Sequence, residues 1–73
     1  MCYNLFMKKI SERIKELRIE RNLTQTQLSK ATGLSQNAIA QWENEKRTPN
    51  IYAVIALADF FEVSTDYLLG VKD

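Results

Sequence analysis

The sequence, 73 residues long, predicts a compact all-α domain of five short helices. Apolar residues recur at intervals of three and four along most of the chain, and no stretch alternates between apolar and polar residues as a half-buried strand would. Turn-forming residues are sparse, with two glycines and one proline between the periodic stretches. The apolar share of 45% and the charged share of 26% are ordinary for a folded domain.

The first predicted helix runs from about Lys9 to Arg21. One stripe of this helix consists of residues spaced by about one turn: Ile10, Ile14, Leu17 and Arg21. Asn22 follows, and asparagine tolerates the left-handed conformation found at helix ends. We therefore expect residues 1–7 to form a loose N-terminal tail, residues 8–70 to form the domain and residues 71–73 to form a short C-terminal end.

Two short helices separated by a tight turn come next. The residues from Thr24 to Gln27 fit a capping box, in which the threonine hydroxyl and the glutamine side chain satisfy the free backbone donors of the first turn. Leu28 and Ala31 are expected to form the buried side of this helix. It ends at Gly33, which adopts positive φ without steric cost, and Ser35 caps the helix that follows.

The remaining residues predict two more helices. Pro49 and Asn50 open the fourth. Its expected apolar stripe is Ile51, Val54, Ile55, Ala58 and Phe61. Ser64 caps a short fifth helix, which Gly70 ends.

Composition excludes several classes of protein. The chain has no histidine and one cysteine, so it offers neither zinc-ligand spacing nor a disulfide, and we expect no metal and no cofactor. The lack of a histidine base and of a glycine-rich phosphate loop argues against an enzyme. The longest apolar run, Ala53 to Ala58, is far short of the roughly 20 residues of a spanning helix, and Met1 to Met7 does not resemble a signal peptide. We expect a cytoplasmic protein.

The charges are unevenly distributed. Residues 1–47 hold nine Lys and Arg against five acids, a balance of +4, whereas residues 48–73 hold one against four, a balance of −3. Such a chain can present a basic face to phosphates. A scatter of solvated surface charges explains the same distribution equally well.

The third predicted helix, about Gln36 to Asn44, separates into two faces. Its polar arc of about 140° holds four amides and a small residue: Gln36, Ala40, Asn44, Asn37 and Gln41. The opposite face holds Ala38, Ile39 and Trp42, which we expect in the core. Amides suit base reading because each can pair bidentately with adenine N6 and N7. The alternative is a plain surface helix, whose exposed face would more often carry Lys and Glu.

These residues together resemble a known family. The motif is Leu23-Thr24-Gln25-x-x-Leu28-x-x-x-x-Gly33-Leu34-Ser35-Gln36-x-x-Ile39-x-x-Trp42-Glu43. The end of the domain matches at Pro49, Leu57-Ala58, Val63-Ser64, Asp66 and Leu68-Leu69-Gly70. Over about Ile10 to Gly70 the chain resembles the Cro/repressor-type helix-turn-helix family, also called the xenobiotic-response-element type.

The resemblance implies a sequence-specific regulator of transcription that binds double-stranded DNA, acts as a repressor and reads the major groove with its third helix. The implied base-reading residues are Gln36, Asn37 and Gln41. The implied contacts to the DNA backbone are Thr24, Gln25, Ser35, Asn44, Lys46 and Arg47. Gln25 is also expected to brace the first reading residue, and Arg18 and Glu43 are expected to form a buried ion pair between the first and third helices.

The chain departs from the family pattern at two turns. Glu45 stands where the family most often has glycine, which questions the conformation there and adds an acid near the phosphates. Glu62 replaces a turn residue such as glycine or asparagine.

Two further expectations concern partners. One reading helix touches few base pairs, so we expect a homodimer that meets through residues 48–73, either in solution or only on DNA. That segment carries the aromatic residues Tyr52, Phe60, Phe61 and Tyr67, although these side chains could instead complete the core of the monomer. A role as a protein-interaction module, such as a toxin-neutralising partner, is compatible with DNA binding. An RNA or single-strand binder would show exposed aromatics interleaved with basic residues.

Overall fold

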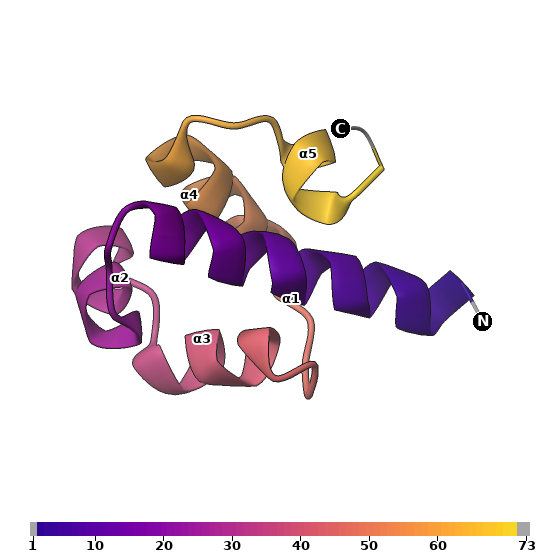
Figure 1. The fold of residues 1–73 in the computed structure, drawn as a ribbon, viewed down its shortest axis with the longest axis horizontal. Helices are drawn as coiled ribbons and strands as arrows, with labels where there is room; N and C mark the ends of the chain where they lie inside the picture. Colours follow the sequence, from indigo (N-terminus) through magenta and orange to yellow (C-terminus); the bar gives the residue numbers. More distant parts are fainter. Residues whose placement is uncertain (1, 72–73) are drawn as a thin grey trace.

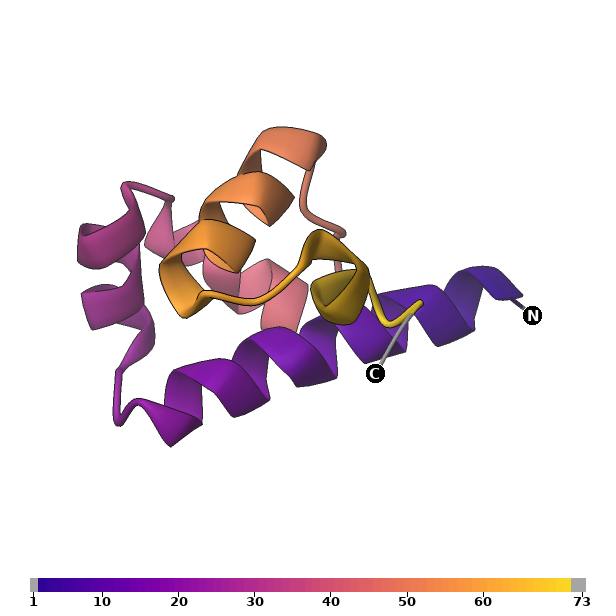
Figure 2. The same ribbon diagram turned by 90° about the horizontal axis from the view of Figure 1, so that it is seen from above.

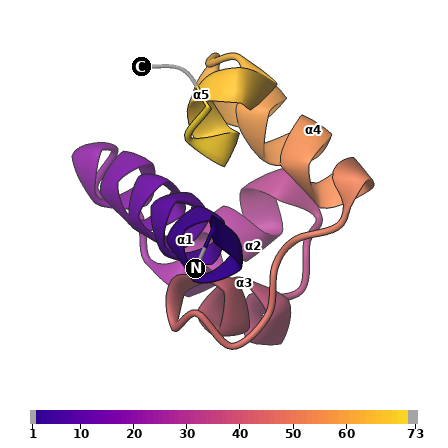
Figure 3. The same ribbon diagram turned by 90° about the vertical axis from the view of Figure 1, so that its right-hand side faces the viewer.

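The computed structural model describes the backbone of residues 2–71 and the side chains of residues 9–71. In that part of the chain every regular element is a helix (Figure 1). The helices are α1 (Cys2–Glu20), α2 (Gln25–Thr32), α3 (Gln36–Glu43), α4 (Ile51–Phe61) and α5 (Thr65–Leu69). The helix α1 lies between α3 on one side and α5 on the other, as Figures 1 and 3 both show. The predicted all-α fold of five helices is confirmed.

The helix α1 is longer than its apolar stripe indicated. It begins at Cys2 rather than near Lys9, and its first turns project beyond the other helices (Figure 2). Apolar residues at helical spacing continue into these turns, because Tyr3, Phe6 and Met7 precede Ile10 by about one and two turns, so the expected start near Lys9 was too late. Arg21 lies just after the end of the helix, and Asn22 has the expected left-handed conformation with φ of 58°. The division into residues 1–7, 8–70 and 71–73 stays a prediction, and Met1, Lys72 and Asp73 lie outside the described residues.

Capping hydrogen bonds confirm the predicted starts of α2, α3 and α5, and the backbone conformation of Gly33 confirms the predicted end of α2. Thr24 Oγ1 accepts the N–H of Gln27 at 3.1 Å, and Gln27 Oε1 accepts the N–H of Thr24 at 2.8 Å, which completes the capping box. Ser35 and Ser64 accept N–H groups from the first turns of α3 and α5. Gly33 has φ of 78°, so the turn between α2 and α3 uses the freedom of glycine.

The core takes one fully buried side chain from each helix. These are Ile14, Leu28, Ile39, Leu57 and Leu68. The helices α2 to α5 are each too short to be stable alone, so this shared core supplies most of the stability that they lack in isolation. No helix in the described residues is long and apolar enough to cross a membrane.

Two expectations about buried residues were wrong. Ala31 is exposed, because Leu28 alone fills the space that α2 leaves against the core. On α4, Ile51 and Ile55 are 67% and 52% exposed. Val54, Ala58 and Phe61 lie in the core as expected, and Ala53 and Leu57 complete the buried face of α4. This helix is apolar on almost every side, so its periodicity did not determine which face would turn inward.

Glu45 and Glu62 both adopt the left-handed backbone conformation, with φ of 62° and 59°. The turns therefore keep the conformation that glycine favours, and each glutamate carries a steric cost of about 1–2 kcal/mol. Both side chains are exposed.

We expect Glu62→Gly and Glu45→Gly each to raise the free energy of unfolding by about 0.5–1 kcal/mol, because relief of the strain exceeds the added entropy of glycine in the unfolded chain. Chemical denaturation measures this effect. Glu16→Gly is the matched control, since the exposed Glu16 is helical and its replacement should destabilise the protein by about 0.5–1 kcal/mol. Destabilisation at positions 45 and 62 would show that the glutamate side chains make favourable interactions.

Candidate nucleic-acid interface

The helices α2 and α3 are joined by a turn of three residues, Gly33 to Ser35, and are held by the core through Leu28 and Ile39. The turn is fixed by side-chain bonds as well: Ser29 Oγ donates to the carbonyl of Leu34, and Thr32 Oγ1 accepts its N–H at 3.3 Å. Two helices joined by a tight glycine-containing turn form a helix-turn-helix.

The helix α3 has the two faces that its sequence indicates. Ile39 and Trp42 are buried, which agrees with the expected place of the tryptophan in the core. Gln36 and Asn37 are exposed, and Gln41 is half-buried one turn further on. The outward face of α3 thus presents uncharged donors and acceptors on a helix whose opposite face is anchored.

The loop that follows α3 carries two cations, Lys46 and Arg47, and one acid, Glu45. The carbonyl of Gln41 accepts the N–H groups of Lys46 at 2.9 Å and Arg47 at 3.4 Å, so the loop folds back onto the end of the helix. Asn44, which caps α3, is exposed together with Glu45, Lys46 and Arg47. The loop therefore holds both cations close to the amide face.

Thr24 and Ser35, the expected backbone contacts at the starts of α2 and α3, are exposed. Their hydroxyl oxygens accept N–H groups of their own helices. A hydroxyl that accepts such a bond still has its proton to donate, so capping leaves both side chains able to bind a phosphate oxygen. The helix N-termini beside them add a partial positive charge.

Arg18 and Glu43 form the ion pair that the resemblance implied. Arg18 Nε donates to Glu43 Oε2 at 2.7 Å and Nη2 donates to Oε1 at 3.0 Å, a bidentate pair. The side chains are 13% and 3% exposed. Hydrogen bonding to Glu43 raises the pKa of Arg18 above its ordinary value, although burial acts in the opposite direction. The guanidinium is therefore charged at any working pH.

The pair belongs to a larger network at the end of α3. Arg18 Nη1 donates to the carbonyl of Leu23 at 2.7 Å, and Gln25 Nε2 donates to Glu43 Oε1 at 3.0 Å. Gln25 thus has a partner that the sequence did not indicate, and its expected contact with Gln36 stays a prediction. The network ties the last turn of α3 to α1, to the start of α2 and to the segment between them.

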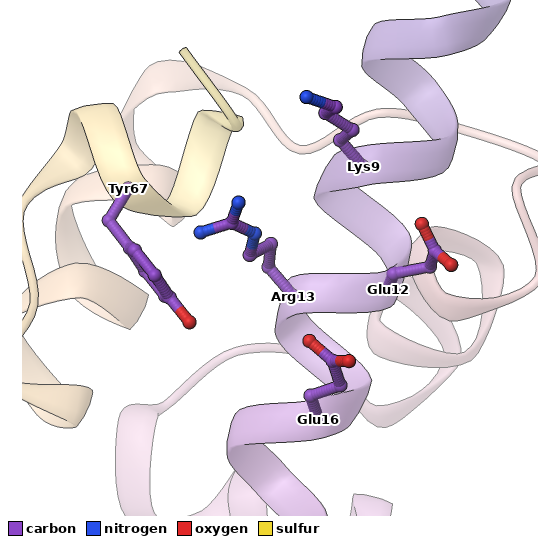
Figure 4. A pocket seen from close by; sticks show the side chains of 5 residues that line it. All are labelled: Lys9, Glu12, Arg13, Glu16 and Tyr67. Atoms are coloured by element: carbon purple, nitrogen blue, oxygen red, sulfur yellow. The ribbon is translucent and has the colours of Figure 1, made fainter. Parts of the chain in front are cut away.

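Two arginines, Arg13 and Arg21, have structural contacts that were not predicted from the sequence. Arg21 Nη2 donates to the carbonyl of Phe61 at 3.0 Å, and its guanidinium lies 5.5 Å from the ring centres of Phe60 and Phe61. Arg13 lies over the ring of Tyr67 at 4.1 Å. In Figure 4 Arg13 and Tyr67 face each other in the hollow between α1 and α5. Because Arg13, Arg18 and Arg21 have these partners, fewer than the nine Lys and Arg side chains of residues 1–47 are available to bind DNA.

No local sequence signal identified the contacts of these arginines, because Phe61 lies 40 residues after Arg21 and Tyr67 lies still further along the chain from Arg13. Among the described residues no group of three or more His, Cys, Asp and Glu side chains could hold a metal ion.

Comparisons with known proteins agree with this geometry. A helix-turn-helix family model matches residues 14–68. The transcriptional activator BcrR of Enterococcus faecalis is 38% identical over 60 residues, which cover 82% of this chain and 29% of that protein. Repressor protein C2 of Salmonella phage P22 is 38% identical over 60 residues, which cover 82% of this chain and 28% of that protein.

A solved structure, an HTH_3 family transcriptional regulator from Vibrio cholerae, matches with a TM-score of 0.82 at 25% identity. The match covers 94% of this chain and 39% of that chain. The chain thus spans less than a third of the length of the two relatives and about two fifths of this structure.

Proposed function

Because the chain belongs to the helix-turn-helix family of DNA-binding transcriptional regulators, a non-enzymatic class, we propose that it binds double-stranded DNA in a sequence-specific manner. On this proposal α3 reads the major groove through Gln36, Asn37 and Gln41. The supporting observation is the outward amide face of α3, held rigid by the core and by the network of Arg18, Gln25 and Glu43.

The amides supply direct readout, since glutamine and asparagine pair with the major-groove edge of adenine. Ala40 lies within the amide arc and is half-buried, so its methyl group is available to contact a thymine methyl. Phosphates are bound at both ends of this surface. Thr24, Gln25 and Ser35 bind at the helix starts, and Asn44, Lys46 and Arg47 bind beyond the end of α3.

Lys46→Ala and Arg47→Ala are each expected to weaken binding to every duplex alike and to reduce the slope of log K against log salt concentration by about one unit, since each removes one phosphate contact. Fluorescence anisotropy at several salt concentrations measures this for a selected and a scrambled duplex. Lys9→Ala is the control, because Lys9 lines the hollow with Arg13 and Tyr67 (Figure 4), and α5 lies across α1 from α3 (Figures 1 and 3). A sequence-selective loss would instead show that the loop reads bases.

We propose repression as the outcome of binding and the cytoplasm as its place. Occupancy of a promoter blocks transcription without any further contact, whereas activation needs a second surface. Of the two relatives described above, one is named as an activator and the other as a repressor. Whether binding lowers or raises transcription therefore needs its own test. A reporter whose promoter overlaps the selected site should lose expression when the protein is present, and a gain would contradict repression.

We further propose that the protein binds its operator as a homodimer. A single α3 reaches only a few base pairs, which gives too little discrimination against roughly 10⁶–10⁹ genomic sites. Two copies related by a two-fold axis add their contacts and require half-sites about one helical turn apart.

Selection from a pool of random duplexes, followed by sequencing, tests the proposed function directly. We expect enrichment of one motif with A·T pairs at the positions that face the amides. Equal recovery of all sequences, from protein that a thermal melt shows to be folded, would contradict sequence-specific binding.

A further inference from the structure

The side chain of Gln25 is held by the far end of the reading helix. Gln25 is the first residue of α2, and its Nε2 donates to Oε1 of Glu43, the last residue of α3, at 3.0 Å. A carboxylate that is paired with an arginine accepts hydrogen bonds and donates none. The amide of Gln25 must therefore turn its nitrogen, and not its oxygen, toward Glu43. The contact thus selects one of the two orientations open to a glutamine amide.

Glu43 is itself fixed in place by Arg18. Both of its carboxylate oxygens accept hydrogen bonds from the guanidinium, and its side chain is 3% exposed. The same guanidinium also fixes the start of α2, because its Nη1 donates to the carbonyl of Leu23 at 2.7 Å, two residues before Gln25. A guanidinium is planar and rigid. Arg18 therefore sets the position of the Gln25 backbone and the position of the acceptor for the Gln25 side chain at once.

The bond to Glu43 leaves half of the amide nitrogen's donor capacity unused. The NH2 group carries two hydrogens that point in different directions, and Glu43 takes one of them. Gln25 is half-buried and the adjacent Thr24 is exposed, so this end of α2 has access to solvent. The free N–H groups of the first helical turn add a partial positive charge there. The second hydrogen can therefore bond to an anion at the start of α2 while Glu43 keeps the first.

Resting on the proposed function, in which Gln25 binds a phosphate, we infer that Glu43 is a positioning residue of the DNA interface. It holds the amide of Gln25 so that the second N–H is directed at a phosphate oxygen before DNA binds. A glutamine side chain that moves freely must be ordered on binding, which weakens an interaction by about twofold to tenfold. Glu43 removes this cost in advance, and because it is almost fully buried it acts through Gln25 and not by touching DNA.

A double-mutant cycle between Gln25→Ala and the uncharged replacement Arg18→Met/Glu43→Leu tests this inference. The replacement removes the acceptor of Gln25 without leaving an unpaired charge. All four proteins are titrated against the selected duplex and a scrambled duplex, below the lowest of their melting temperatures. In the wild-type background we expect Gln25→Ala to weaken binding to both duplexes about tenfold, because it removes one hydrogen bond to a charged group. In the uncharged background the loss should be about threefold or less, because the amide is no longer held.

Lys46→Ala in the same two backgrounds is the control. Lys46 lies in the loop after α3, three residues beyond Glu43, and no contact joins it to Gln25 among the described side chains. We expect its replacement to weaken binding equally in both backgrounds. A smaller effect of Lys46→Ala in the uncharged background would show that the whole end of α3 has moved, which would overturn the inference. An equal effect of Gln25→Ala in both backgrounds, or none in the wild type, would overturn it as well.

A second measurement needs no destabilised variant. In the ¹H–¹⁵N spectrum of the wild type, the side-chain amide of Gln25 is assigned by its loss in Gln25→Ala. We expect one of its two protons to be shifted downfield by Glu43, and to stay so when the selected duplex is added, while the other proton shifts. Collapse of the downfield shift would show that Gln25 leaves Glu43 to bind DNA, contrary to the inference. Wild type that fails to prefer the selected duplex over the scrambled one would instead contradict the proposed function.

Discussion

Arg18→Met is expected to lower the free energy of unfolding by about 3–5 kcal/mol, because it leaves the carboxylate of Glu43 buried without its cation. Glu43 is 3% exposed and Arg18 is 13% exposed. The carboxylate therefore has less access to water than the guanidinium. Because Glu43→Gln leaves the more accessible guanidinium unpaired, it should lower the free energy of unfolding by less than Arg18→Met does. For a small domain whose total stability is about 5–15 kcal/mol, a loss of this size should lower Tm by more than 10 °C.

Thermal denaturation followed by circular dichroism measures both shifts. Lys15→Met is the control, since it removes an exposed cation from the same helix and should change Tm by little. The double variant Arg18→Met/Glu43→Leu, which leaves no unpaired charge, should recover part of the loss. Shifts of one or two degrees in both single variants would show that the pair contributes as little as an ordinary surface pair.

Replacement of Gln36, Asn37 or Gln41 by Ala is expected to weaken binding to the selected operator by about 1–3 kcal/mol in each case. Binding to scrambled duplex should change little, because these side chains touch bases and not phosphates. Gln36 and Asn37 are exposed, and alanine keeps the backbone carbonyl of Gln41 that holds the loop. The melting temperature should therefore stay close to that of the wild type.

Competition between operator and scrambled duplex measures this preference. Thr65→Ala provides the control, since Thr65 is exposed on α5, which lies across α1 from α3 (Figures 1 and 3). If all three alanine variants kept the wild-type preference, α3 would not be the reading helix. A loss confined to one residue would assign the specificity to that position.

The sequence alone determined the features that depend on near neighbours along the chain. Thr24, Ser35 and Ser64 cap their helices because a hydroxyl reaches an N–H three residues later, a relation that is visible in the sequence. Gly33 and Asn22 end their elements for equally local reasons. The two faces of α3 followed from helical periodicity, because apolar and polar residues alternate there with a clear period.

Only the tertiary structure decided the features that depend on atoms distant in the chain. The inward face of α4 was ambiguous because almost every side of that helix is apolar, and packing against the other helices chose Leu57 over Ile55. Gln25 bonds to Glu43, 18 residues away, and Arg21 bonds to the carbonyl of Phe61, 40 residues away. A charged or amide side chain has many partners of suitable chemistry in the sequence, and the folded backbone brings one of them within hydrogen-bond distance.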